Sequence, residues 1–161
     1  MSVPAYDILL VCHVVAGLVG FGAIAAGGLA ASSARRSADP GSDEAVRRFF
    51  RQGPDWPARA IFLVPLLGLA LLFGGDRSAA HHLWPWVGLG LWVTAVGVAT
   101  AICWPAERDA QVALADLQGA SEESRALLVR GFRDACRKME QAVTAISLCF
   151  LAAVAVMIVK P

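Results

Sequence analysis

The fold of this chain is decided by residues 8–34, ILLVCHVVAGLVGFGAIAAGGLAASSA, which contain no charged side chain. A helix needs about 20 apolar residues to cross the hydrocarbon core of a membrane, so this stretch is long enough for one span. It is longer than the apolar part of a signal peptide, and no Lys or Arg precedes it. We therefore expect this segment to remain in the protein as its first transmembrane helix.

Three further apolar runs follow, at residues 60–75, 83–106 and 141–159. The second is short and contains Pro65, but membrane helices tolerate proline where a neighbouring group bonds the carbonyl that it leaves free. We predict an all-α fold, a four-transmembrane-helix bundle, in a single integral membrane domain covering residues 1–161. The predicted spans lie at about residues 7–33, 58–75, 83–105 and 139–159.

The distribution of Lys and Arg predicts the orientation of these spans. Twelve of the fourteen basic residues fall in the connections between spans one and two and between spans three and four. The other two are Arg77 and Lys160. Because basic residues concentrate in cytoplasmic loops, we predict that both termini lie on the non-cytoplasmic side, N-out and C-out.

Both basic connections contain helix signals, which predicts cytoplasmic helical extensions of the bundle. Residues 42–44, Ser-Asp-Glu, read as a helix start with acids at the positive end of the helix dipole. Gly119 reads as a stop, and Ser121 as the start of a new helix that continues into the fourth span. Apolar residues then recur at helical spacing and predict a packed face: Leu128, Phe132, Ala135 and Met139.

Composition agrees with a lipid bilayer as the main partner. Hydrophobic residues make up 57% of the chain, and the charged 17% gather in two connections where acids interleave with the bases. No free basic stripe is left for a nucleic acid, so we predict no nucleic-acid partner. Four cysteines without paired spacing favour buried small apolar residues over a disulfide framework. No sequence motif of a soluble enzyme is present.

His13 is the candidate functional residue that the sequence singles out, because an ionisable side chain at membrane depth is costly and usually faces other helices. Small residues follow it on the same helical face, where another helix can approach closely: Ala16, Gly17, Gly20, Ala23, Gly27 and Ala31. We predict helix packing at Gly17, Gly20 and Gly27. His13 itself either ligates haem iron or a metal ion, or bonds a carbonyl or hydroxyl of a neighbouring helix.

Two more histidines, His81 and His82, lie at the start of the third span, on the same predicted outer side as His13. One of them could approach His13 and complete a bis-histidine haem site or half of a copper or zinc site. The alternative is a pair of hydrated interfacial histidines. The nearby tryptophans, among them Trp92, either line a porphyrin pocket or belong to an interfacial belt.

Two segments resemble a known family. Residues 10–17, Leu-Val-Cys-His-Val-Val-Ala-Gly, with Gly-Phe-Gly at 20–22, look like the opening of small four-helix bacterial membrane proteins. The ending Met157-Ile158-Val159-Lys160-Pro161 is similar to the close of the DUF2269 family of integral membrane proteins. More distantly, the chain resembles CopD-like copper-resistance domains and HemJ-type protoporphyrinogen oxidases, whose haem-associated first-span histidine matches His13. The chain lacks the third-span lysine of the HemJ type.

This resemblance implies a multi-pass protein of the bacterial inner (cytoplasmic) membrane. It favours a function in which His13, with His81 or His82, binds haem b or a copper ion near the outer leaflet in a redox role. The alternative is a non-catalytic accessory subunit whose glycine-rich first span packs against a larger membrane complex or forms a homo-oligomer. A transporter is disfavoured because the spans contain almost no charged residues that would mark a pathway.

The orientation can be tested by labelling single cysteines with a membrane-impermeant maleimide. We expect Ser78→Cys to react in intact cells and Ser124→Cys to react only after the membrane is permeabilised, because the two residues lie on opposite sides in the predicted topology. Labelling of Ser78→Cys from the cytoplasmic side alone would show that the predicted topology is inverted.

Overall fold

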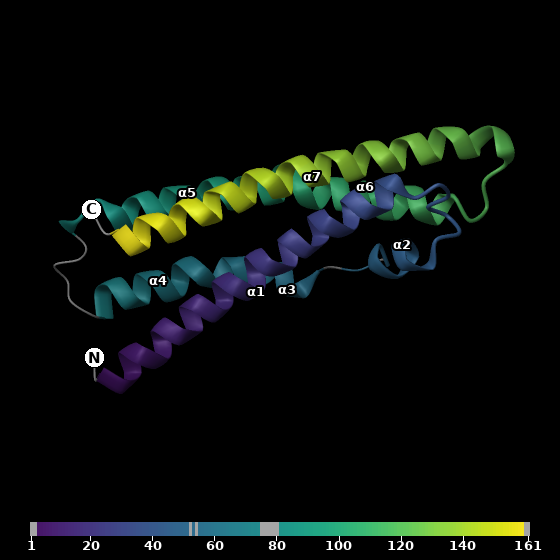
Figure 1. Cartoon of the computed structure of the whole chain (residues 1–161). Helices are drawn as coiled ribbons and strands as arrows, with labels where there is room; N and C mark the ends of the chain where they lie inside the picture. The colour runs from purple at the N-terminus through teal and green to yellow at the C-terminus, as the bar shows by residue number, and fades with distance from the viewer. Residues whose placement is uncertain (1–2, 52, 54, 75–80, 160–161) are drawn as a thin grey trace. The chain divides into compact units, whose positions relative to one another are not determined.

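The computed structural model describes residues 3–51, 53, 55–74 and 81–159, and every regular element in these ranges is helical. The predicted end of the second span at Gly75, the basic residues Arg77 and Lys160, the labelling position Ser78 and the terminal Pro161 lie outside the described residues. Figure 1 traces the elements along the chain. They are α1 (Val3–Arg36), α2 (Glu44–Phe49), α3 (Trp56–Arg59), the 3₁₀ turn η1 (Ala60–Phe62), α4 (Leu63–Gly74), α5 (Trp84–Val98), the π-helical turn η3 (Ala99–Cys103), α6 (Trp104–Asp116) and α7 (Glu122–Val159).

Four helical segments in the described ranges are long and apolar enough to cross a membrane. They are Ala5–Arg36, Trp56–Gly74, Trp84–Asp116 and Glu122–Val159. The prediction of an all-helical protein with four membrane-crossing helices is thus confirmed at the level of length and composition, and it indicates a multi-pass membrane protein. The side of the membrane on which each helix end lies stays a prediction.

The third of these segments contains a π-helical turn that is explained by Pro105. Proline has no N–H, so Pro105 cannot bond the carbonyl four residues earlier. The turn η3 directly precedes this position, and the N–H of Trp104 donates to the carbonyl of Ala99, five residues back. One wide turn therefore adjusts the backbone to the proline, and the helix continues through α6 to Asp116.

The chain forms two compact units, and the first comprises residues 1–24, 55–97 and 146–161. Its helices contact one another through small residues and aromatic rings. Phe21 of α1 stacks on Phe150 of α7 with ring centroids 4.4 Å apart. Ile61 of η1 is fully buried, and its backbone lies against Gly20 of α1. This unit contains His13 and therefore the predicted cofactor site.

The second unit comprises residues 25–54 and 98–145. Its core includes Phe132 of α7, which is fully buried and meets the ring of Phe50 edge-on at 5.5 Å between centroids. Met139 is buried on the same face of α7. The apolar spacing in this part of the sequence thus correctly marked the buried face of the helix.

The predicted helix boundaries in the second unit agree with the structure. Asp43 caps α2, and its carboxylate accepts hydrogen bonds from the backbone N–H groups of Ala45 and Val46. Helix α6 ends at Asp116 and α7 begins at Glu122, immediately after Ser121. Whether these elements extend into the cytoplasm stays a prediction.

The predicted packing glycines of α1 differ in how closely they are approached. A methyl group at Gly20 would lie 2.5 Å from the backbone nitrogen of Ile61, so only glycine fits there. At Gly27 it would lie 3.5 Å from the side chain of Met139, an ordinary contact, and at Gly17 it would meet nothing within 4 Å. Gly28 was not among the predicted packing glycines, but it is also closely approached. A methyl group there would lie 2.6 Å from the side chain of Val143.

These differences give a matched pair of substitutions. Gly20→Ala should lower the free energy of unfolding by about 1–3 kcal/mol, because the backbone of Ile61 must move to admit the methyl group. Gly17→Ala should be neutral or stabilising by up to about 1 kcal/mol, because the site is open and alanine favours helix. Denaturant titration in micelles, followed by circular dichroism, measures both changes. Equal effects would show that Ile61 does not lie against α1 as described.

Candidate functional site

His13 is half-buried and lies against α4. Its Nδ1 atom is 2.9 Å from the backbone carbonyl oxygen of Val64. A carbonyl oxygen can only accept a hydrogen bond, so Nδ1 carries the proton and donates. In the neutral imidazole this bond fixes the tautomer and leaves Nε2 as the nitrogen with a free lone pair. No hydrogen bond to Nε2 occurs among the residues that the structure describes.

Gly68 of α4 makes room for the imidazole ring. A methyl group at this position would lie 3.0 Å from Cε1 of His13, which is tighter than most real contacts, and 3.5 Å from Nδ1, which is an ordinary contact. The distance to Nε2 would be 4.0 Å, so this nitrogen lies farther from α4 than Nδ1 does. The ring therefore lies with Cε1 nearest to Gly68 and with Nδ1 at the carbonyl of Val64.

The backbone next to this site is interrupted by Pro65. Because proline has no N–H, the carbonyl of Ile61, four residues earlier, lacks its usual helical donor. The indole Nε1–H of Trp92 on α5 donates to this oxygen at 2.8 Å. The sequence predicted that a neighbouring group would bond the carbonyl freed by Pro65, and the structure identifies that group as Trp92.

Two side-chain donors from two different helices thus hold one short stretch of backbone, residues 61–64. His13 of α1 bonds Val64, and Trp92 of α5 bonds Ile61. The two acceptors differ in one respect. In a regular helix the carbonyl of Val64 also receives the N–H of Gly68, whereas the carbonyl of Ile61 has no such donor at Pro65. Trp92 therefore supplies Ile61 with a donor in place of the one that Pro65 removes, beside the backbone N–H of Leu63. His13 adds a second bond to a carbonyl that has a helical donor.

The structure places the predicted site residues as follows. His13 contacts α4, whereas the sequence suggested an approach to the third span. His81 and His82 are exposed and precede α5. Within the described ranges, no group of three or more His, Cys, Asp or Glu side chains is arranged to hold a metal ion. The bond to Val64 fixes the tautomer of His13 and leaves Nε2 as its one nitrogen with a free lone pair.

Sequence reasoning did not assign roles to Gly68 or to the indole N–H of Trp92. Gly68 lies in an apolar run where glycine has no obvious purpose, and that is the signal that something approaches the backbone closely. For Trp92 the signal was Pro65, because a proline within a membrane helix demands an outside donor for the carbonyl four residues before it. A single tryptophan could not be selected on that basis, since five occur in the chain.

No protein-family model, curated protein or solved structure matches this chain. The resemblance to the DUF2269 family therefore stays a prediction, and the function is argued from the site itself.

The role of Trp92 can be measured against that of another tryptophan. Trp92→Phe should lower the free energy of unfolding by about 1–2 kcal/mol, because it removes the side-chain hydrogen bond to the buried residue Ile61. Trp56→Phe is the matched control, since Trp56 is 72% exposed, and it should have an effect within about 0.5 kcal/mol. Circular dichroism during denaturant titration in micelles measures both. A Trp92→Phe protein as stable as the control would refute the proposed bond.

Proposed function

We propose that this chain is a multi-pass protein of the bacterial inner membrane that binds haem b through Nε2 of His13, near the outer leaflet, in a redox role. The observation that carries the proposal is the hydrogen bond from Nδ1 of His13 to the carbonyl oxygen of Val64. Histidines that ligate metals donate their other ring N–H to a carbonyl or carboxylate, which fixes the tautomer and orients the ring.

The donor set favours haem over a bare metal ion. A closed copper or zinc site needs three or four protein ligands, and the described residues bring no such group together. Haem iron can be held by one proximal histidine, because the porphyrin supplies the other four nitrogens. His13 would be that ligand, and the bound haem would supply one-electron redox chemistry at its iron.

The surrounding residues support this use of His13 by holding its ring in place. Gly68 leaves room for the ring against α4, and the bond to Val64 restrains rotation of the imidazole. Trp92 fixes the segment that carries the acceptor by bonding Ile61, three residues before Val64. A ligand nitrogen held by packing and by a second hydrogen bond is preorganised for iron. His81 and His82 are candidates for a second axial ligand on the predicted outer side.

The accessory-subunit alternative was based on the glycine-rich first span. Gly20, Gly27 and Gly28 of that span are already approached by Ile61, Met139 and Val143 of the same chain. A partner protein or a second copy of the chain would therefore need a different face of the helix. We keep this alternative as the outcome expected if the protein binds no cofactor.

The proposal is tested by the absorption spectrum and metal content of protein purified in detergent from cells supplied with haem and copper. Wild-type protein should show a Soret band and contain about one iron per chain. His13→Ala should lose the band completely. His13→Gln should also lose it, because an amide can still donate to Val64 but offers no ring nitrogen to iron.

His81→Ala and His82→Ala test the second axial position. At most one of them should shift the band, because haem iron that is bound to His13 has one axial position left. A colourless wild-type protein without metal would overturn the proposal, and so would a His13→Gln protein that retains haem. Copper in place of iron would keep His13 as a ligand but show that further donors complete the site. Co-purification of a second protein without any cofactor would favour the accessory subunit.

A further inference from the structure

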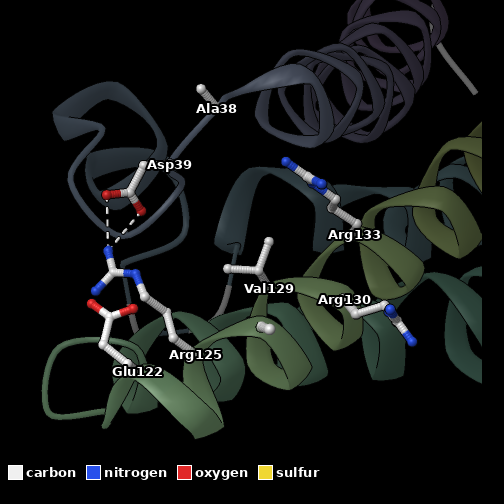
Figure 2. A pocket seen from close by; sticks show the side chains of 8 residues that line it. Ala38, Asp39, Glu122, Arg125, Val129, Arg130 and Arg133 are labelled. Atoms are coloured by element: carbon white, nitrogen blue, oxygen red, sulfur yellow. Dashed lines mark hydrogen bonds and ion pairs between the residues drawn. The ribbon is translucent and has the colours of Figure 1, made fainter.

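The second unit contains a polar groove between the turn after α1 and the first turns of α7. Its volume is about 590 Å³. Figure 2 shows the side chains around it. The lining residues are Ala38, Asp39, Glu122, Arg125, Ala126, Val129, Arg130 and Arg133. The lining contains three arginines and two acids, so its net charge is +1.

One of the three arginines is matched by an acid. Nη2 of Arg125 donates to both carboxylate oxygens of Asp39, at 2.9 and 2.8 Å, as Figure 2 shows. The hydrogen bond from Arg125, with help from Ser42, holds the pKa of Asp39 below its ordinary value. The pair is therefore ionised at neutral pH, and its contribution disappears only as the pH falls through that lowered pKa. It ties the turn to α7 and forms one end of the groove.

The other two arginines retain free donors. Nη2 of Arg133 donates to the backbone carbonyl of Ser37 at 3.2 Å, which leaves most of its guanidinium N–H groups available. Arg130 is exposed and makes no salt bridge with any residue in the described ranges. Both come from α7, one turn apart, and Figure 2 shows Arg133 pointing toward the turn after α1 and Arg130 pointing away from it. Ser37 restrains one of the two guanidinium groups, so part of the cost of ordering them is met before any ligand binds.

We propose that this groove binds a phosphate group through Arg133, and that Arg130 contributes a second contact when the phosphate is free in solution. A guanidinium group presents two parallel N–H donors that match the oxygens of a phosphate, and two such groups one helical turn apart can share one phosphate. Glu122 also lines the groove and repels anions, so the binding position is at the Arg133 end, away from Glu122. The phosphate belongs either to an anionic lipid headgroup or to a soluble phosphate ester.

The distance along α7 between the two arginines and the last apolar run distinguishes a lipid headgroup from a soluble phosphate ester. Gln141 begins that run, and α7 is continuous from the groove into it. Arg133 precedes Gln141 by eight residues and Arg130 by eleven, which at 1.5 Å per residue places them about 12 and about 17 Å before it. Headgroups extend about 5–8 Å beyond the hydrocarbon core. A lipid phosphate therefore reaches only the long side chain of Arg133, whereas a soluble ester can contact both arginines.

The first experiment titrates the detergent-purified full-length protein with inorganic phosphate at constant ionic strength, with chloride as the reference anion. Wild-type protein should gain thermal stability with phosphate beyond the effect of chloride. The Arg130→Gln/Arg133→Gln variant should raise the Kd for phosphate at least tenfold. The matched control, Arg47→Gln/Arg108→Gln, removes two exposed arginines outside the groove and should keep the wild-type Kd. Circular dichroism and elution volume confirm that each variant is folded.

The second experiment places the protein in nanodiscs of phosphatidylcholine with or without phosphatidylglycerol. If a lipid headgroup is the source, phosphatidylglycerol should raise the melting temperature, Arg133→Gln should remove that gain, and Arg130→Gln should leave it. If a soluble ester is the source, both single variants should weaken phosphate binding, and the lipid should have no effect. Two results overturn the proposal: neither phosphate nor phosphatidylglycerol acts on wild-type protein, or the control variant loses binding as the groove variant does.

Discussion

A backbone carbonyl within an apolar membrane helix must find a hydrogen-bond donor, because no water is there to supply one. In this protein that requirement is strongest at Ile61, since Pro65 removes the donor that the helix would have provided. The indole of Trp92 meets it, and in doing so it joins α5 to the segment before α4. In the adjoining backbone, Ile61 also lies against Gly20 of α1, and the carbonyl of Val64 accepts the hydrogen bond from His13. The packing of the first unit is therefore organised around one proline.

His13 also donates a hydrogen bond to a backbone carbonyl of this stretch. Its bond to Val64 is not required to satisfy the helix, because that carbonyl has a helical donor of its own. An ionisable side chain at membrane depth is nevertheless costly to keep. The fixed tautomer of His13 leaves Nε2 with a free lone pair that can bind a metal. This is the basis of the haem proposal. If His13 were only a structural donor, a side chain without the second nitrogen would serve equally well.

The second unit combines an apolar core with ion pairs at its surface. Arg35 pairs with Glu140 at 3.0 Å, and Arg125 pairs with Asp39 at 2.8 Å. Exposed pairs of this kind contribute little to stability. Most of the stabilisation comes from buried apolar residues such as Phe132 and Phe50. The ion pairs instead position the turn after α1 against α7, and this arrangement creates the groove in which Arg130 and Arg133 keep free donors.

From the sequence alone, the class of fold and the helix starts next to Asp43 and Ser121 could be predicted. Charge-free runs of sufficient length can only be stable as helices in a membrane, and the caps at Asp43 and Ser121 are local signals that act within a few residues. The sequence also selected His13, because a lone histidine in such a run stands out. Only the tertiary structure decided which helix His13 contacts, that Trp92 rather than another tryptophan bonds Ile61, and that Gly20 and Gly28 are closely approached while Gly17 is not. These outcomes depend on which residues distant in the chain come together, and helical periodicity gives the face of a residue but not the partner that the face meets.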